Sequence, residues 1–367
     1  DNITNAPAAS PDGNPYAAQA PFRGWHGFRL PGLAVLGSRL SSFVEQWLDA
    51  QGNPELLRVF VNTVLCEWED IKGESVDETG LLSRREDWSK ILPPGTQLPA
   101  GVAVLTLGVD VQKDRVEYEV IGWGRGEESW SIEYGKLYGN VKEDAAVLLE
   151  LDRVLDRPFV HAKGFPLYIR AASVDTGYAT QAVYRYVKPR LRRALPNGQP
   201  QFVFGIKGRS EYGRPLWPET SASKRLKLAG RINLWTLGVD AGKDQVMARL
   251  SIAEPGPGYC HFDINRQADY FKGLTAEQCR MVRRAGVDRR VWELKKVGQP
   301  NEPFDLRVYG YAALVGLQAK PFLLNLEAAC IAVEQAGDTP AKDKATGANA
   351  TQRTRRATRQ RSKGYET

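Results

Sequence analysis

Three aspartates have the residue type and the local setting of ligands for a divalent metal ion. Asp110 and Asp175 each end an apolar, β-branched stretch that predicts a buried strand. Neighbouring strands would hold the backbone fixed there, and a metal ligand needs that rigidity. Asp305 lies early in an apolar helical stretch, on the side that carries Val308 and Tyr309 and faces the core.

Three carboxylates that converge would form an oxygen-rich site, and Mg²⁺ or Mn²⁺ prefers such ligands. Two of these ions, about 4 Å apart, could activate a water and stabilise the leaving 3′-oxygen of a phosphodiester. An acid on the core side of a helix also needs a partner or a cation, because burying a bare charge is costly. Each aspartate by itself has a simpler interpretation as a turn or N-cap residue.

Four further residues could reach the same site. Asp240 and Lys243 follow an apolar stretch, and we favour an N-cap aspartate beside a solvated lysine. Lys207 lies between glycines at a strand end, where it could neutralise developing charge or be an ordinary surface lysine. Glu117 and Glu119 alternate with apolar residues, so we expect surface acids, although Glu119 could supply a fourth ligand.

Basic residues exceed acidic ones, with a net charge of +7 and a pI of about 9.1. This balance suits a polyanionic partner such as nucleic acid. Two basic segments are candidates for DNA contacts. The first is a helix, and basic helices are often simply exposed to solvent, so DNA binding and plain solvent exposure both stay open for it. The residues expected to contact DNA phosphates lie in a helix and in a loop: Arg185, Lys188, Arg190, Arg192 and Arg193, then Arg209, Lys224 and Arg225.

The composition excludes several classes of protein. Hydrophobic residues make up 42% and charged residues 25% of the 367 residues, which excludes global disorder. No run of about 18 apolar residues occurs, so we expect no membrane span. The four cysteines and three histidines are scattered, so neither a zinc site nor a disulfide framework is indicated, and a reducing compartment is expected.

The predicted elements suggest how the acids are positioned. Three strands joined by short turns predict an antiparallel meander, and helices and strands alternate after it. This order favours an α/β fold with a mixed sheet flanked by helices. We predict strands at 102–109, 115–123, 129–137, 167–174, 201–206 and 232–239, and helices at 142–155, 181–195 (broken near Pro189), 275–284 and 302–317.

Several ordered motifs resemble the nuclease domain of phage terminase large subunits of the lambda GpA type. They are residues 108–124 followed by Glu128-Ser-Trp130, residues 173–178, Gly205-Ile-Lys-Gly208 and residues 301–309, and the match covers roughly residues 24–320. The resemblance implies an RNase H-like fold and metal-dependent cutting of double-stranded, concatemeric viral DNA. It implies two Mg²⁺ or Mn²⁺ ions, with Asp110, Asp175 and Asp305 as the catalytic and metal-binding acids.

The resemblance also predicts three regions along the chain. Residues 1–98 resemble the end of an ATPase region and act as a linker, residues 99–322 form the nuclease domain, and residues 323–367 form a basic tail. The tail lacks an apolar period from residue 337, so we expect it to be disordered alone. It is either a solubilising segment or a polybasic arm for nucleic acid or a partner.

The chain contains no G-x-x-x-x-G-K-[ST] motif, so we expect the C-terminal part of a longer protein, without translocation activity of its own. The implied partners are viral DNA, a small terminase subunit and a portal protein, with a possible oligomer on the portal and no membrane. The implied location is the bacterial host cytoplasm during infection. Two alternatives stay open: a non-catalytic scaffold that binds DNA or the portal, and another RNase H-like nuclease such as a resolvase or recombinase.

Overall fold

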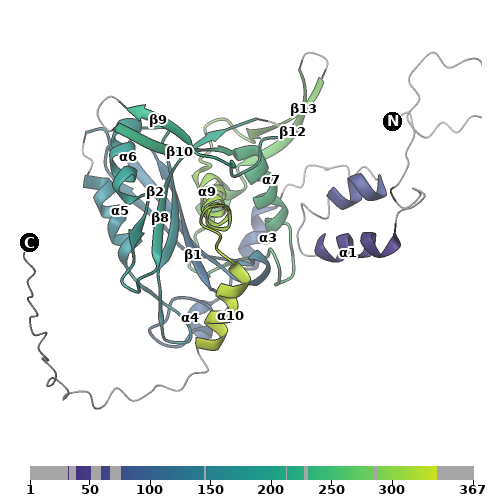
Figure 1. Cartoon of the computed structure of the whole chain (residues 1–367), viewed down its shortest axis with the longest axis horizontal. Coiled ribbons are helices and arrows are strands. Elements are labelled where there is room, and N and C mark those ends of the chain that lie inside the picture. Colours follow the sequence, from purple (N-terminus) through teal and green to yellow (C-terminus); the bar gives the residue numbers. More distant parts are fainter. Residues whose placement is uncertain are drawn as a thin grey trace, which may run out of the picture.

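The structure, a computed structural model, describes residues 32, 39–50, 59–66, 76–143, 146–211, 213–226, 230–284 and 287–336. Its centre is one large sheet with the strand order β11-β3-β2-β1-β6-β8-β10-β9, and β7 pairs with β8 beside this path (Figure 1). The strands are β1 (Val104–Val111), β2 (Arg115–Trp123), β3 (Ser129–Tyr138), β6 (Ile169–Asp175), β7 (Arg193–Ala194), β8 (Pro200–Arg209), β9 (Ala222–Leu226), β10 (Gly230–Gly238) and β11 (Cys260–Phe262).

The sheet is mixed, as the sequence predicts. Strands β1, β2 and β3 form the expected antiparallel meander. On the other side of β1, strands β6, β8 and β10 follow in parallel. The meander joins the parallel strands through β1, so the predicted α/β class with a mixed sheet is confirmed.

One predicted helix is wrong. The segment 275–284 forms strand β12 (Glu277–Arg284), which pairs antiparallel with β13 (Val287–Leu294) in a separate two-stranded sheet. The pairing with β13 supplies backbone hydrogen bonds that the local sequence does not reveal, so tertiary context overrides helix propensity. This hairpin projects from the body of the protein in Figure 1.

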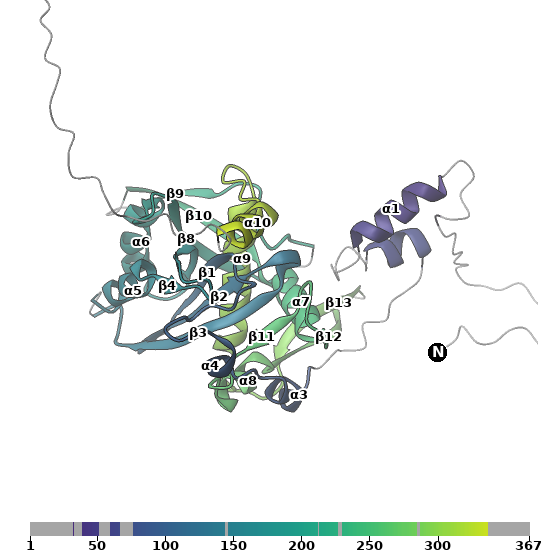
Figure 2. The ribbon, with the colours of Figure 1, turned by 90° about the horizontal axis from the view of Figure 1, so that it is seen from below.

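Helices cover both faces of the sheet (Figures 1 and 2). Helix α9 (Glu302–Gln318) lies on one face, and α5 (Ala146–Asp156) and α6 (Thr180–Val187) lie on the other. Side chains of β1 alternate between them, because successive residues of a strand point to opposite faces. Leu107 and Val109 pack with α5 and α6, whereas Thr106 and Gly108 meet α9.

The contact between α9 and β1 is unusually close. The Thr106 hydroxyl donates a 2.9 Å hydrogen bond to the Gly310 carbonyl oxygen of α9. A Cβ atom on Gly108 would stand 2.1 Å from the Leu306 carbonyl oxygen and 2.9 Å from the Gly310 nitrogen. Only glycine therefore lets the backbone of α9 lie against β1, and this approach brings the first turn of α9 to the end of β1.

Segments on both sides of the predicted nuclease domain contribute to its core. Leu81 in α3 (Glu78–Ser83) and Trp88 in α4 (Trp88–Ile91) are buried with residues of the sheet. Helix α10 (Leu326–Ala336) packs Cys330 and Val333 against the same core. The boundaries at 98 and 322 stay predictions, and residues 337–367 of the predicted tail lie outside the described part of the chain.

The described elements also include helices α7 (Val239–Leu250), α8 (Ala268–Leu274) and α1 (Leu40–Ala50), of which α1 lies apart from the sheet in Figure 1. Strands β4 (Phe159–Val160) and β5 (Pro166–Leu167) pair with each other in a short two-stranded sheet. Among the residues that the structure describes, none of the helices is both long enough and apolar enough to cross a membrane.

Replacing Gly108 by Ala tests the close approach of α9. We expect a loss of about 3 kcal/mol or more in the free energy of unfolding, because a backbone clash cannot be relieved by turning a side chain. Gly80→Ala is the matched control, since a Cβ there meets nothing within 4 Å. Urea denaturation of both variants measures the difference, and equal stability of the two would contradict the packing described here.

Candidate active site

Asp110 and Asp175 lie at the same end of the sheet. Strands β1 and β6 run parallel with Val109 beside Val174, so the next residue of each strand stands at the same edge. Val109 and Val174 both point into the core shared with α5 and α6. Asp110 and Asp175 therefore point to the opposite face, which α9 covers.

Asp305 reaches this edge from the first turn of α9. Asp110 is only 6% exposed, and its pKa rises to about 7, mainly through burial and further through the charges of Asp175, Asp305 and Glu302. Burial likewise raises the pKa of Asp305 to about 6, and Glu277 and Asp175 add to that rise while Lys243 opposes it. The three aspartates thus share one electrostatic environment.

Asp175 is held by its own turn. Its Oδ2 accepts a 3.1 Å hydrogen bond from the Gly177 backbone N–H. Burial raises the pKa of Asp175, while hydrogen bonds from the Gly177 and Thr176 backbone and the charge of Lys207 lower it. The turn after β6 therefore fixes this carboxylate, and the nearby charge of Lys207 favours its ionised form.

Tyr309 of α9 lies near the three aspartates and Glu277. It follows Asp305 by one helical turn and is 8% exposed. Burial raises its pKa well above the usual value, and the charges of Asp305, Asp175, Asp110 and Glu277 raise it further. The charges of all four carboxylates act on this one hydroxyl, and the strand register and the start of α9 bring Asp110, Asp175 and Asp305 to the same edge of the sheet. We call Asp110, Asp175, Asp305 and Glu277 the acidic cluster.

The interpretation of Lys243 as a solvated lysine is wrong. Its Nζ lies 2.7 Å from Glu277 Oε1 and 3.5 Å from Asp305 Oδ1. Asn301 Nδ2 donates to the same two carboxylates, at 2.7 Å to Glu277 Oε1 and 3.1 Å to Asp305 Oδ2. Sequence reasoning missed Glu277 and Asn301, because Glu277 lies in the segment that was predicted as a helix.

The N-cap prediction for Asp240 is also wrong. Gly238 is the N-cap of α7, and Asp240 lies in the first turn, where its Oδ1 accepts a 2.6 Å hydrogen bond from the Ser210 hydroxyl. Lys207 is exposed on β8. It follows Ile206, which stands opposite Asp175 in the sheet, and its charge lowers the pKa of Asp175.

Glu117 and Glu119 are not surface acids. Both are fully buried, because β2 is an internal strand whose polar face is covered. Glu119 Oε1 accepts hydrogen bonds from the Ser131 hydroxyl at 2.6 Å and the Tyr270 hydroxyl at 2.8 Å. Arg307 of α9 pairs with the same oxygen at 3.3 Å. Glu119 therefore links β2 to α8 and α9.

Comparison with known proteins identifies the family of this chain. A family model described as "Terminase large subunit gpA, endonuclease domain" matches residues 25–322. The terminase large subunit of Escherichia phage lambda is 32% identical over 283 residues, which cover 74% of this chain and 40% of that protein. This chain belongs to the gpA terminase endonuclease family. The resemblance noted in the sequence is confirmed.

A second relative and one solved structure also match this chain. The terminase large subunit of Enterobacteria phage P21 is 32% identical over 286 residues, covering 74% of this chain and 40% of that protein. The chain thus matches less than half the length of these curated relatives. The solved large terminase of a thermophilic bacteriophage has a TM-score of 0.36 and 10% identity, over 77% of this chain and 53% of that one. The fold assignment stands on the strand order of this chain alone.

The acidic cluster of this terminase domain has the donor chemistry of a Mg²⁺ or Mn²⁺ site, since its ligands are carboxylate oxygens. Burial, together with the neighbouring carboxylates, raises the pKa of Asp110 and of Asp305, and a bound cation would favour the ionised forms of both. As the side chains stand, no three acidic, histidine or cysteine groups in the described part of the chain enclose a metal position. Asp110 accepts from the Gln112 side chain, and Lys243 and Asn301 hold Asp305. Ion binding thus requires the carboxylates to turn from these donors.

The predicted DNA contacts divide into two groups. Arg190 pairs with Asp152 at 2.5 Å and Arg193 with Asp156 at 2.7 Å, so internal partners hold both. Arg193 stands opposite Gln201 near the start of β8, whereas Asp175 stands beside Ile206. Five residues of strand separate these points by about 16 Å. Arg193 therefore lies away from the acidic cluster.

The remaining basic residues are more exposed. Arg185, Lys188 and Arg192 are exposed. Arg209 ends β8 at the side of Asp175 and is 63% exposed, with Glu211 at 3.2 Å. Lys224 and Arg225 lie on β9, and their side chains are outside the described set. Arg209 and Lys207 are thus the best placed of the predicted contacts.

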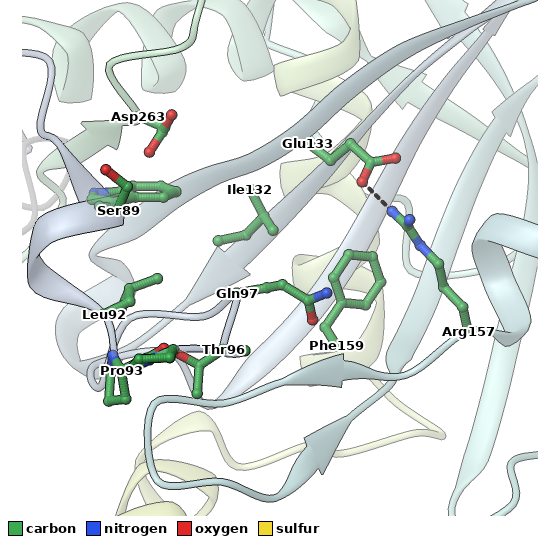
Figure 3. A pocket seen from close by; sticks show the side chains of 13 residues that line it. Ser89, Leu92, Pro93, Thr96, Gln97, Ile132, Glu133, Arg157, Phe159 and Asp263 are labelled. Carbon is green, nitrogen blue, oxygen red and sulfur yellow. Dashed lines mark hydrogen bonds and ion pairs between the residues drawn. The ribbon is translucent and has the colours of Figure 1, made fainter.

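A separate cavity of about 380 Å³ opens near α4 (Figure 3). Its lining includes Leu92, Ile132 and Phe159, and Arg157 pairs there with Glu133. None of the acidic cluster lines this cavity. It is therefore distinct from the candidate active site.

The raised pKa of Asp110 predicts how stability depends on pH. The folded state holds this proton more tightly than the unfolded state, so its contribution to stability is lost as pH rises from about 4 to 7. The Asp110→Asn variant has no titrating carboxyl at this position, so its stability does not fall in this way as pH rises. In metal-free protein, the stability of D110N relative to the parent should rise by about 2–3 kcal/mol from about pH 5 to pH 8. Denaturant titrations at both pH values measure it, and a difference independent of pH would contradict the buried environment of Asp110.

Proposed function

We propose that this chain is a Mg²⁺- or Mn²⁺-dependent endonuclease that cuts double-stranded, concatemeric viral DNA during genome packaging. The observation that carries the proposal is the acidic cluster, in which two strand ends and the first turn of α9 bring carboxylates to one edge of the sheet. The family match over residues 25–322 supports the same reaction class. Hydrolysis of the phosphodiester by two metal ions is the mechanism that a carboxylate-rich site suits best.

Asp110, Asp175 and Asp305 are the residues that would hold the metal. When bound, the ions supply an activated water and stabilise charge on the leaving oxygen. The chain itself supplies the framework: the turn after Asp175 fixes one carboxylate with the Gly177 N–H, and the close packing of α9 on β1 fixes another. Rigid support of this kind fixes the backbone from which the ligands project, and the side chains turn to meet the ion.

The substrate would approach the edge of the sheet where β6 and β8 end. Lys207 and Arg209 are exposed there and could attract phosphates of the DNA backbone. Their positive charge offsets the repulsion between the acidic cluster and a polyanion. We therefore assign the first phosphate contacts to this edge rather than to the basic run near Arg193.

The wider role is proposed from the relatives, which are terminase large subunits. We propose that the protein acts in the cytoplasm of the bacterial host during infection, together with a small terminase subunit and a portal protein. An oligomer on the portal belongs to the same proposal.

Asp110→Asn tests the nuclease assignment. Incubation of plasmid DNA with Mn²⁺ should give nicked and linear products with the parent protein, and at least about a hundredfold less with the variant, because a metal ligand is lost. Asp269→Asn changes a carboxylate that is 91% exposed on α8 and should leave cleavage intact. Circular dichroism confirms that both variants fold. Undiminished cleavage by D110N would contradict the assignment, and a parent protein that binds DNA without cutting it would favour the scaffold alternative.

DNA affinity should fall steeply with salt, because phosphate contacts release condensed counterions. We expect a loss of about a hundredfold or more between roughly 50 and 200 mM salt in fluorescence anisotropy. Arg209→Ala should reduce the slope of log affinity against log salt by about one unit, whereas Arg193→Ala, opposite Gln201 near the start of β8 and away from this edge, should leave it unchanged. A flat salt response, or equal effects of the two variants, would argue against this DNA-binding edge.

A further inference from the structure

Lys243 and Glu277 form a buried ion pair inside the candidate active site. The side chains are 12% and 5% exposed, and the Lys243 ammonium donates to both Glu277 oxygens at 2.7 Å. The Phe304 ring lies beneath the ammonium, with 5.6 Å from Nζ to the ring centroid. Because solvent screens such a pair weakly, its charges act strongly on their neighbours.

This ion pair is coupled directly to Asp305. Lys243 Nζ lies 3.5 Å from Asp305 Oδ1, and Asn301 bridges Glu277 Oε1 and Asp305 Oδ2. Two donors therefore hold Glu277 and Asp305 side by side. Two carboxylates at this spacing would repel each other without a cation between them.

We propose that Lys243 is a positioning residue that cancels the charge of Glu277 and thereby sets the affinity of the acidic cluster for its divalent ion. The residue acts through Glu277 and Asp305 and not on the reacting atoms. The proposal rests on the metal-dependent nuclease function above, and it adds to that function a residue that tunes the metal site.

The charge of the acidic cluster explains why adjusting its affinity for a divalent ion is useful. The four carboxylates of the acidic cluster carry four negative charges when all are ionised, and the Lys243 ammonium beside Glu277 offsets one of them. A more negative cluster attracts a divalent cation more strongly, and it repels the phosphate of the DNA more strongly as well. Cancelling one carboxylate from within the protein limits both effects while the side chain of Glu277 remains in place.

A double-mutant cycle tests the proposal through metal binding alone. Isothermal titration of Mn²⁺ into metal-stripped protein, without DNA, gives the dissociation constant for each variant. Lys243→Met should tighten binding about tenfold or more, and Glu277→Gln should weaken it by a similar factor, because each changes the cluster by one charge. The double variant should return to within about threefold of the parent, and so should Lys243→Arg, which keeps the charge.

A matched control separates this effect from loss of packing. Arg290 pairs with Asp244 at 2.9 Å, one residue after Lys243 in α7, and it makes no contact with Asp305 among the hydrogen bonds and ion pairs that the structure describes. Arg290→Met should lower stability while leaving Mn²⁺ affinity unchanged. Urea denaturation of each variant shows whether it is folded.

The outcomes separate the two proposals. A parent protein that binds no Mn²⁺ would overturn the metal-dependent function. A parent that binds Mn²⁺ while Lys243→Met binds it equally or more weakly would overturn the tuning role and leave the nuclease proposal intact. Tightening in Lys243→Met that Glu277→Gln fails to reverse would also overturn it, because the effect would not pass through Glu277.

Discussion

The backbone of α9 lies directly against β1, and the candidate site depends on this contact. Gly108 has no Cβ to hold the helix away, and the Thr106 hydroxyl bonds the Gly310 carbonyl oxygen at 2.9 Å. The approach brings the first turn of α9, with Asp305, to the strand ends that carry Asp110 and Asp175. A helix displaced outward by one side chain would carry Asp305 away from its neighbours.

The same contact forces carboxylates together in a place with little water. Burial raises the pKa of Asp110 to about 7 and that of Asp305 to about 6. The protein tolerates this because nearby cations and amides offset part of the charge: Lys207 for Asp175, and Lys243 with Asn301 for Asp305. A divalent cation would neutralise the negative charge that remains in this rigid, poorly solvated site.

A second set of charges anchors the framework. Arg307 of α9 pairs with Glu119 of β2 at 3.3 Å, two residues along the helix from Asp305. Arg115 of β2 pairs with Glu302 at the start of α9 at 2.8 Å. Breaking a buried pair by removing one partner is strongly destabilising. These links therefore resist rotation of α9 and so fix where its first turn lies.

The sequence was a good guide to the elements whose pattern is local. Alternation and apolar runs predicted the meander of β1 to β3 and the strands that end at Asp175 and near Lys207. Helix α9 was predicted from its continuous apolar character. Strand β12 was missed because its hydrogen bonds come from β13, which local propensity does not encode.

The side-chain environments were less predictable. Alternation assigned Glu119 to the polar face of β2 correctly, but it cannot show that α8 and α9 cover this face. Lys243 pairs with Glu277 across 34 residues of sequence, so no spacing rule could reveal the pair. Such partners become visible only when the fold places distant segments side by side.

The central claim is that the acidic cluster binds divalent cations, and anomalous diffraction from a Mn²⁺-soaked crystal tests it most directly. The account predicts manganese peaks within about 2.0–2.6 Å of carboxylate oxygens of Asp110, Asp175 and Asp305. Manganese bound only elsewhere, or a fully soaked crystal in which these carboxylates keep their contacts to Gln112, Lys243 and Asn301 and hold no ion, would contradict it.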